Sequence, residues 1–160
     1  MKKFFLLSLF LGLATLLFAD IPISLGSVSK TSLEVVSTSV KVTLGDESLY
    51  LDKDQIDYMV QWLTSRLDAM KVIESKGFDI EDSAWAGTVP VNTIGASYGC
   101  RILYSNKKSQ MVLTFKRAED ILEVSAVEKL IALLKQASLS VVARADQHRE
   151  FQLLIRSLKG

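Results

Sequence analysis

The hydrophobic pattern of the chain changes between an alternating period and a helical period. From Leu33 the β-branched run 36–44 alternates apolar and polar residues, which predicts a half-buried strand. Residues 53–75 instead carry apolar residues at steps of three and four, which predicts a helix with one buried face. Asp52 is the expected N-cap of this helix, and Gly77 marks its expected end.

A second stretch repeats this order of apolar run, capping residue and helix. The run ends at Val124, Ser125 follows as the predicted N-cap, and Glu128 stands at the capping-box position. Apolar residues at helical spacing then predict a core helix over 126–137. The same features occur 73 residues earlier, at Leu49–Val60. The parallel indicates either a recurring way of joining a strand to a helix or a faint duplication.

The remaining segments have weaker patterns. Residues 93–105 and 110–116 are predicted as the two strands of a hairpin. Residues 78–92 lack a clear period and are expected to form a long irregular connection. Residues 20–32 are rich in serine and are expected to be a linker or N-terminal arm, with an edge strand through Ile23 as the alternative.

The C-terminal segment 138–160 is predicted to be helical and amphipathic. Two serines, Ser138 and Ser140, interrupt good helix formers, so the segment is either a separate helix or the continuation of the preceding one. Packing on the domain's own sheet is expected, and docking on a membrane or a partner is the alternative. Its apolar residues at helical spacing are Phe151, Leu154, Ile155 and Leu158, and its basic residues are Arg144, Arg149, Arg156 and Lys159.

These elements predict an α+β fold in residues 33–137. We expect an antiparallel sheet of four to five strands with two main helices packed on one face, followed by the C-terminal amphipathic helix. The chain has 160 residues, of which 49% are apolar and 23% charged, as is ordinary for a folded domain. Its formal net charge of +1 gives no general attraction for nucleic acid, so no nucleic-acid partner is expected.

Residues 1–19 have the organisation of a signal peptide. Lys2 and Lys3 precede an uncharged apolar run over 4–18, and Ala19 can stand before a cleavage site. We therefore expect export to the periplasm or secretion, with the mature chain starting at Asp20 or, alternatively, at Thr15. An uncleaved anchor is the other possibility, although the run of about 15 residues is shorter than the roughly 20 that span a bilayer.

One motif resembles the environment of a catalytic serine. Gly95–Gly99 fits the G-x-S-x-G pattern around Ser97, and His148 is the single histidine. A nucleophile elbow needs a strand, a tight turn and a helix, whereas the residues after Gly99 predict a strand. A small serine hydrolase using Ser97 is therefore the alternative function. The acidic residues in the required order between Ser97 and His148 are Glu119, Asp120 and Asp146.

No other set of residues predicts a reaction or a cofactor. Cys100 is the single cysteine and is expected to be an inert buried thiol. One cysteine and one histidine do not supply a zinc site, so neither a metal nor a cofactor is expected. The sequence therefore favours a non-enzymatic binding or assembly module of the bacterial envelope, with another envelope protein as partner. A membrane-tethered subunit with an uncleaved N-terminal anchor is a further alternative.

Overall fold

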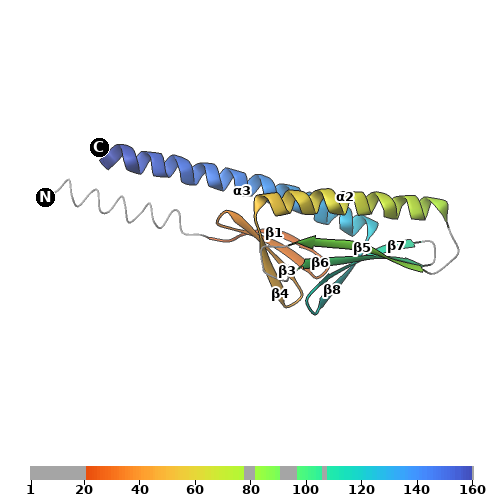
Figure 1. Ribbon diagram of the computed structural model, residues 1–160. Helices are drawn as coiled ribbons and strands as arrows, with labels where there is room; N and C mark the ends of the chain where they lie inside the picture. The colour runs from red at the N-terminus through yellow and green to blue at the C-terminus, as the bar shows by residue number, and fades with distance from the viewer. Residues whose placement is uncertain (1–20, 78–81, 91–96, 106–107, 160) are drawn as a thin grey trace.

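The computed structural model describes residues 21–77, 82–90, 97–105 and 108–159. Two helices lie on one face of two four-stranded antiparallel sheets (Figure 1). The α+β class and the placement of both helices on one face are confirmed. The described strands number eight in two sheets, rather than four to five in one sheet. The predicted signal peptide lies outside the described residues.

The first sheet is formed by β1 (Ile23–Val28), β2 (Thr31–Val36), β3 (Ser39–Leu44) and β4 (Glu47–Leu51), in chain order. The prediction of one strand over 36–44 is wrong, because the chain reverses at Ser37, whose φ is 54°. Val35 pairs with Val40 across this two-residue turn, so buried residues change from odd to even positions. The continuous alternation at 36–44 hid this change from odd to even buried positions, and with it the turn.

The N-terminal arm belongs to this sheet. Residues 20–32, expected primarily as a linker, instead supply β1 and the start of β2, which confirms the edge-strand alternative. Val28 is buried, but the exposed Ile23 and the register shift between Ser24 and Gly26 break the alternation. An edge strand with a bulge has no strict period of two, which explains the weak pattern.

The second sheet is formed by β5 (Asp82–Pro90), β6 (Ser97–Ser105), β7 (Lys108–Phe115) and β8 (Ala118–Glu123). The irregular connection predicted over 78–92 is wrong for its described part, which is β5. A register shift between Trp85 and Gly87 marks a bulge in this strand as well. The bulge again explains why no period was visible in the sequence.

Helix α2 (Lys53–Lys76) has the predicted ends. The Gln55 amide donates to Asp52 Oδ1 at 2.9 Å, and the Asp52 amide donates to Gln55 Oε1 at 3.1 Å, which is a complete capping box. At the other end Gly77 has a φ of 60° and donates its amide to the Glu74 carbonyl at 3.1 Å.

Helix α3 (Val124–Lys159) is one continuous helix, so the boundary expected at 137/138 is not a break. The serines there do not end the helix, because their hydroxyls bond within it or to α2. Ser140 donates to the Gln136 carbonyl at 2.9 Å, and Ser138 donates to Asp57 Oδ1 at 2.7 Å. The helix begins at Val124, so Ser125 lies in its first turn and the N-cap assignment was wrong.

The two candidate caps should respond differently to substitution. Asp52→Ala should lower the free energy of unfolding by about 1 kcal/mol, because the hydrogen bond that the Asp52 carboxylate accepts from the Gln55 amide is lost. Ser125→Ala should change it by less than about 0.5 kcal/mol, because this exposed residue is within the helix. Urea denaturation of both variants measures the difference. An equal loss in both variants would contradict the assignment.

The chain consists of two successive units with the same order of four strands and one helix. In the part of each unit that comprises the last two strands and the helix, equivalent residues are 71 positions apart, not the 73 inferred from the sequence. Gly45 and Lys116, the first residues of equivalent turns, have φ values of 57° and 52°. Buried residues also coincide, as in the pairs Val40/Met111, Val42/Leu113, Leu44/Phe115, Leu51/Leu122, Ile56/Val127, Met59/Leu130, Leu63/Leu134 and Met70/Val141.

Each helix packs on both sheets. Helix α3 contacts β1, β2 and β3 of the first unit as well as its own β7 and β8, and α2 contacts β5 and β7 of the second unit. Gly26 in β1 lies close enough to α3 that a Cβ there would be 3.7 Å from Leu133. The buried residues of both units therefore form one core, and neither unit has a core of its own.

A buried carboxylate joins the two units at one end of the sheets. Asp120 in β8 is fully buried and is bonded to the β1–β2 turn. Ser29 Oγ donates to it at 2.6 Å, the Lys30 amide at 3.0 Å and Thr31 Oγ1 at 2.7 Å. The equivalent position in β4 is the buried Leu49. We call these four bonded residues, 29–31 and 120, the Asp120 junction.

Candidate functional site

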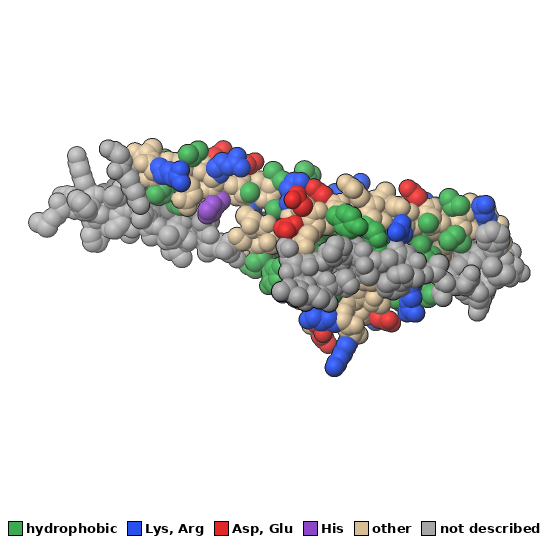
Figure 2. All heavy atoms as spheres, viewed as in Figure 1, with side chains coloured by type: hydrophobic (Ala, Val, Ile, Leu, Met, Phe, Trp, Pro, Cys, Tyr) green, Lys and Arg blue, Asp and Glu red, His purple; other side chains and the backbone are tan. Residues whose placement is uncertain are grey.

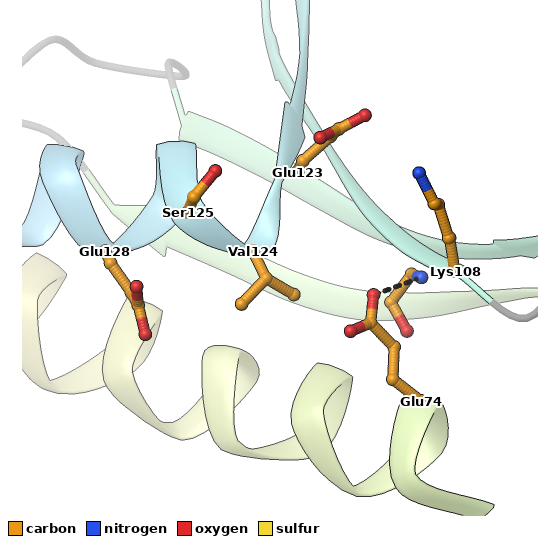
Figure 3. Close-up of a pocket in the computed structure, with 7 residues that line it drawn as sticks. Glu74, Lys108, Glu123, Val124, Ser125 and Glu128 are labelled. Carbon is orange, nitrogen blue, oxygen red and sulfur yellow. Dashed lines mark hydrogen bonds between the residues drawn. The ribbon is translucent and has the colours of Figure 1, made fainter. Parts of the chain in front are cut away.

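A groove of about 290 Å³ lies between the end of α2 and the junction of β8 with α3 (Figure 3). Glu123 and Ser125 point to one side of that junction, whereas Val124 and Glu128 point toward α2. The groove is lined by Glu74, Lys108, Ser109, Glu123, Val124, Ser125 and Glu128. Ser125 and Glu128, assigned to a cap from the sequence, thus lie at a surface groove.

Structural contacts already engage three of the polar residues of this groove. Glu74 Oε1 accepts from the Ser109 amide at 2.8 Å, and Ser109 Oγ donates to the Met70 carbonyl at 3.1 Å. Lys71 Nζ lies 2.6 Å from Glu128 Oε1. The hydrogen bond to this carboxylate raises the pKa of Lys71 above its ordinary value. These bonds tie α2 to β7 and to α3.

The chemistry available in the groove is limited to weak electrostatic attraction. Its lining carries three glutamates and one lysine, which favours cations over anions. Within the described part of the chain, no three histidine, cysteine or acidic side chains converge as metal ligands. Because two of the three glutamates also bond neighbouring elements, we assign the groove a role in packing the second unit against α2.

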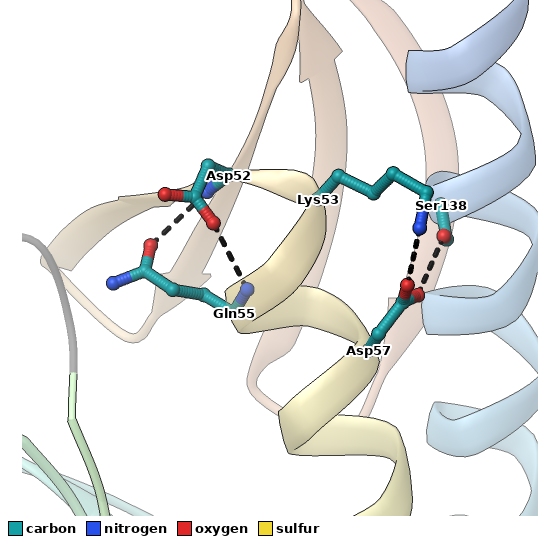
Figure 4. Close-up of polar contacts among 5 residues, drawn as sticks. All are labelled: Asp52, Lys53, Gln55, Asp57 and Ser138. Atoms are coloured by element: carbon teal, nitrogen blue, oxygen red, sulfur yellow. Dashed lines mark hydrogen bonds and ion pairs between the residues drawn. The ribbon is translucent and has the colours of Figure 1, made fainter.

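The two helices are also joined by a polar contact near the start of α2 (Figure 4). The Asp57 carboxylate accepts from Lys53 Nζ at 2.5 Å and from Ser138 Oγ at 2.7 Å. The hydrogen bond from Lys53, followed by that from Ser138, lowers the pKa of Asp57 below its ordinary value. Both donors stabilise the ionised carboxylate.

This lowered pKa predicts a pH dependence of stability. The unfolded chain binds a proton at Asp57 more readily, so the contribution is present above the ordinary value of 3.8. It should be lost as the pH falls through the lower pKa of the folded protein. Asp57→Asn should therefore destabilise the protein near neutral pH and have a smaller effect under more acidic conditions. Urea midpoints measured across this range test the prediction; a constant difference between the two proteins would contradict it.

The C-terminal part of α3 projects beyond the sheets (Figure 1). Val141 is its last buried residue, and the Arg144 guanidinium donates to the Ile21 carbonyl at 2.7 Å at the base of the projection. Helix α2 ends at Lys76, and the equivalent position in α3 is Gln147. We call residues 148–159, which continue α3 beyond the length of α2, the α3 extension.

The extension carries an apolar stripe that does not continue the core face of α3. After Val141 the positions of the core face are occupied by polar residues such as His148 and Gln152. The stripe is turned by about a third of a turn from that face, given 3.6 residues per turn. Its side chains at Leu154 and Leu158 are 55% and 60% exposed. The α3 stripe comprises Phe151, Leu154, Ile155 and Leu158.

Basic and hydrophobic side chains both lie along this projecting end (Figure 2). Arg149 is 75% exposed on its side chain and lies 3.8 Å from Asp146. Within the described residues, neither helix is long and apolar enough to cross a membrane. The extension exposes three large apolar side chains, Leu153, Leu154 and Leu158. It is therefore our candidate functional site.

The residues of the hydrolase hypothesis are distributed over different elements. Ser97 is the first residue of β6, which leads toward β7 rather than into a helix. Asp120 bonds the β1–β2 turn, and Glu119 lies 3.7 Å from Arg101. Asp146 and His148 are exposed on α3, at the base of the extension. Among the described residues, Ser97 is followed by a strand and not by the helix that a nucleophile elbow requires.

Cys100 lies within β6, where its backbone pairs with Gly87 and Leu113. Its predicted burial concerns a side chain outside the described part of the structure. The sequence indicated Asp120 only as a candidate acid of the hydrolase hypothesis, so its bonds to the β1–β2 turn were not predicted. Its position could have been found from the alternation Asp120, Leu122 in β8, which places Asp120 on the buried face.

The chain matches no protein-family model and no curated protein. Among solved structures it is similar to the crystal structure of a protein with unknown function from the DUF155 family of Prochlorococcus sp. NATL2A. The two chains are 9% identical with a TM-score of 0.47, over 73% of this chain and 98% of the other. At these values the similarity assigns neither a family nor a function to this chain.

Proposed function

We propose that the chain is an exported, non-enzymatic binding or assembly module of the bacterial envelope. In this proposal the α3 extension is the docking element for a component of the envelope. Export is supported by the basic start, the apolar run and the small residue at position 19 in the N-terminal segment. The docking role is supported by the apolar side chains that the extension exposes.

The extension is the observation that carries the proposal. Helix α2 has 24 residues and α3 has 36, and the extension is the additional part of α3. Its side chains at Leu154 and Leu158 leave apolar surface of the extension exposed to water. Covering the α3 stripe with a partner therefore stabilises the extension and removes apolar surface from water.

Export and docking can be tested in one fractionation experiment. The full chain is expressed in a bacterial host, and its distribution and N-terminal sequence are determined. We expect an envelope-associated protein that starts at Asp20 or Thr15. Cytoplasmic protein with Met1 intact would contradict the export proposal.

Two pairs of substitutions then test the docking element. Leu154→Glu with Leu158→Glu should release the protein from the envelope-associated fraction. Leu139→Glu with Leu153→Glu adds the same charge at exposed leucines of α3 outside the stripe, and should leave the distribution unchanged. Equal retention of both variants would show that the stripe is not the docking element.

The two alternative functions are decided by separate measurements. If the chain turned over an ester and Ser97→Ala abolished the turnover, the serine hydrolase would replace the binding module. Recovery of the chain from membranes with residues 4–18 still attached would establish the tethered subunit instead of a released one.

A further inference from the structure

We infer that the α3 extension binds an anionic membrane surface and lies along it with the α3 stripe buried among the lipids. The inference rests on the proposed function, because export to the envelope brings the extension to a membrane surface. It identifies the docking partner of the extension by its chemistry.

The geometry of the extension is that of a helix lying in a membrane interface. The stripe residues follow the spacing i, i+3, i+4 and i+7, which places them within an arc of about 100°. No charged residue of the extension falls within this arc, whereas Arg149 and Arg156 fall on the opposite side. A helix with an apolar stripe and a basic polar side partitions to the interface without crossing the bilayer.

The charge of the extension favours an anionic surface. Residues 148–159 contain three basic residues, Arg149, Arg156 and Lys159, and one acidic residue, Glu150. This excess is local, because the whole chain is nearly neutral with a formal net charge of +1. Basic side chains close to anionic lipids gain from the negative surface potential, whereas they would gain little from a neutral surface.

The position of the extension also favours the membrane. The Arg144 side chain at its base is bonded to the carbonyl of Ile21, so the extension starts beside the point where the N-terminal segment joins the domain. Residues 4–18 of that segment are the most apolar part of the sequence. While this segment is still attached during export, the extension therefore starts beside the part of the chain that is held at the membrane.

A second copy of the chain fits the stripe less well. Of the four stripe residues, Leu154 and Leu158 are exposed, whereas Phe151 and Ile155 are already half-buried, so the stripe offers little area to a partner protein. A stable interface between two proteins buries about 800 Å² on each partner. A membrane requires no such complementary area, because the stripe partitions into the interface without a shaped partner surface.

Vesicle sedimentation tests the inference. The protein starting at Asp20, which contains every described residue, is mixed with vesicles of phosphatidylcholine with or without phosphatidylglycerol. We expect binding to the anionic vesicles that is about tenfold stronger than binding to the neutral ones. Leu154→Glu with Leu158→Glu should weaken binding to anionic vesicles by at least about tenfold. Leu139→Glu with Leu153→Glu, which changes the charge equally, should weaken it much less.

A second variant keeps the experiment decisive if the stripe substitutions unwind the extension. Arg149→Gln with Arg156→Gln retains the stripe and should weaken binding to anionic vesicles by about tenfold, with little change on neutral vesicles. Circular dichroism of each variant reports the helix content.

Two results would overturn the inference. One is the absence of vesicle binding by the unsubstituted protein. The other is concentration-dependent self-association in sedimentation velocity that the stripe variant abolishes, which would make a second copy the partner. Either result would reject lipid as the partner. If export were normal and association with the envelope still required the stripe, the proposed function would remain supported.

Discussion

Replacing Asp120 by alanine should lower the free energy of unfolding by about 3–5 kcal/mol. The substitution removes a fully buried carboxylate that accepts hydrogen bonds from Ser29, Lys30 and Thr31. Hydrogen bonds to a charged acceptor are stronger than those between neutral groups, and the Lys30 amide and Thr31 hydroxyl would be left without this acceptor. Urea denaturation monitored by circular dichroism measures the loss.

Two further variants separate the hydrogen bonds from the loss of volume. Asp120→Asn keeps the size of the side chain but replaces one acceptor oxygen by a donor, so it should still cost about 2–3 kcal/mol. Glu119→Ala is the matched control, because this neighbouring carboxylate is exposed and contacts Arg101 only at 3.7 Å. It should cost less than about 1 kcal/mol. A loss in Asp120→Ala no larger than in this control would disprove the role of the Asp120 junction.

The repeated unit makes a second prediction of comparable size. Leu63→Ala in α2 and Leu134→Ala in α3 should each lower the free energy of unfolding by about 2–5 kcal/mol, because both side chains are fully buried. The two residues are equivalent under the shift of 71, and they belong to the same core cluster. Denaturant titration should therefore show a loss in this range for both variants.

The control variant is chosen by the alternative equivalence, the shift of 73 residues that the sequence indicated. Under that shift Leu63 is equivalent to Gln136, which is exposed. Gln136→Ala should change the free energy of unfolding by less than about 0.5 kcal/mol. A large loss in Gln136→Ala and a small one in Leu134→Ala would show that the assigned equivalence is wrong.

The Asp120 junction shows how the two units are made different. Its equivalent, Leu49, is an apolar residue packed in the core, whereas Asp120 faces the polar β1–β2 turn of the other unit. A buried carboxylate requires donors, and only the turn at 29–31 supplies them here. The junction thereby fixes the relative position of the two sheets at that end.

Features with local causes could be predicted from the sequence alone. Asp52, Gln55 and Gly77 determine the two ends of α2 because capping depends on residues a few positions apart. The α+β class and the core faces of both helices also follow from periodicity. The apolar stripe at 151–158 was visible in the same way.

The way in which these elements combine depends on contacts between distant parts of the chain. The bulges near Gly26 and Gly87 interrupt the alternation of β1 and β5, so two edge strands were hidden in the sequence. Ser125 resembled an N-cap, but the helix begins at Val124 and Glu128 pairs with Lys71 of α2. The burial of Asp120 and the projection of the α3 extension depend on residues about 90 to 120 positions apart in the chain. Local patterns do not encode such distant contacts, because each depends on how the two units pack against one another.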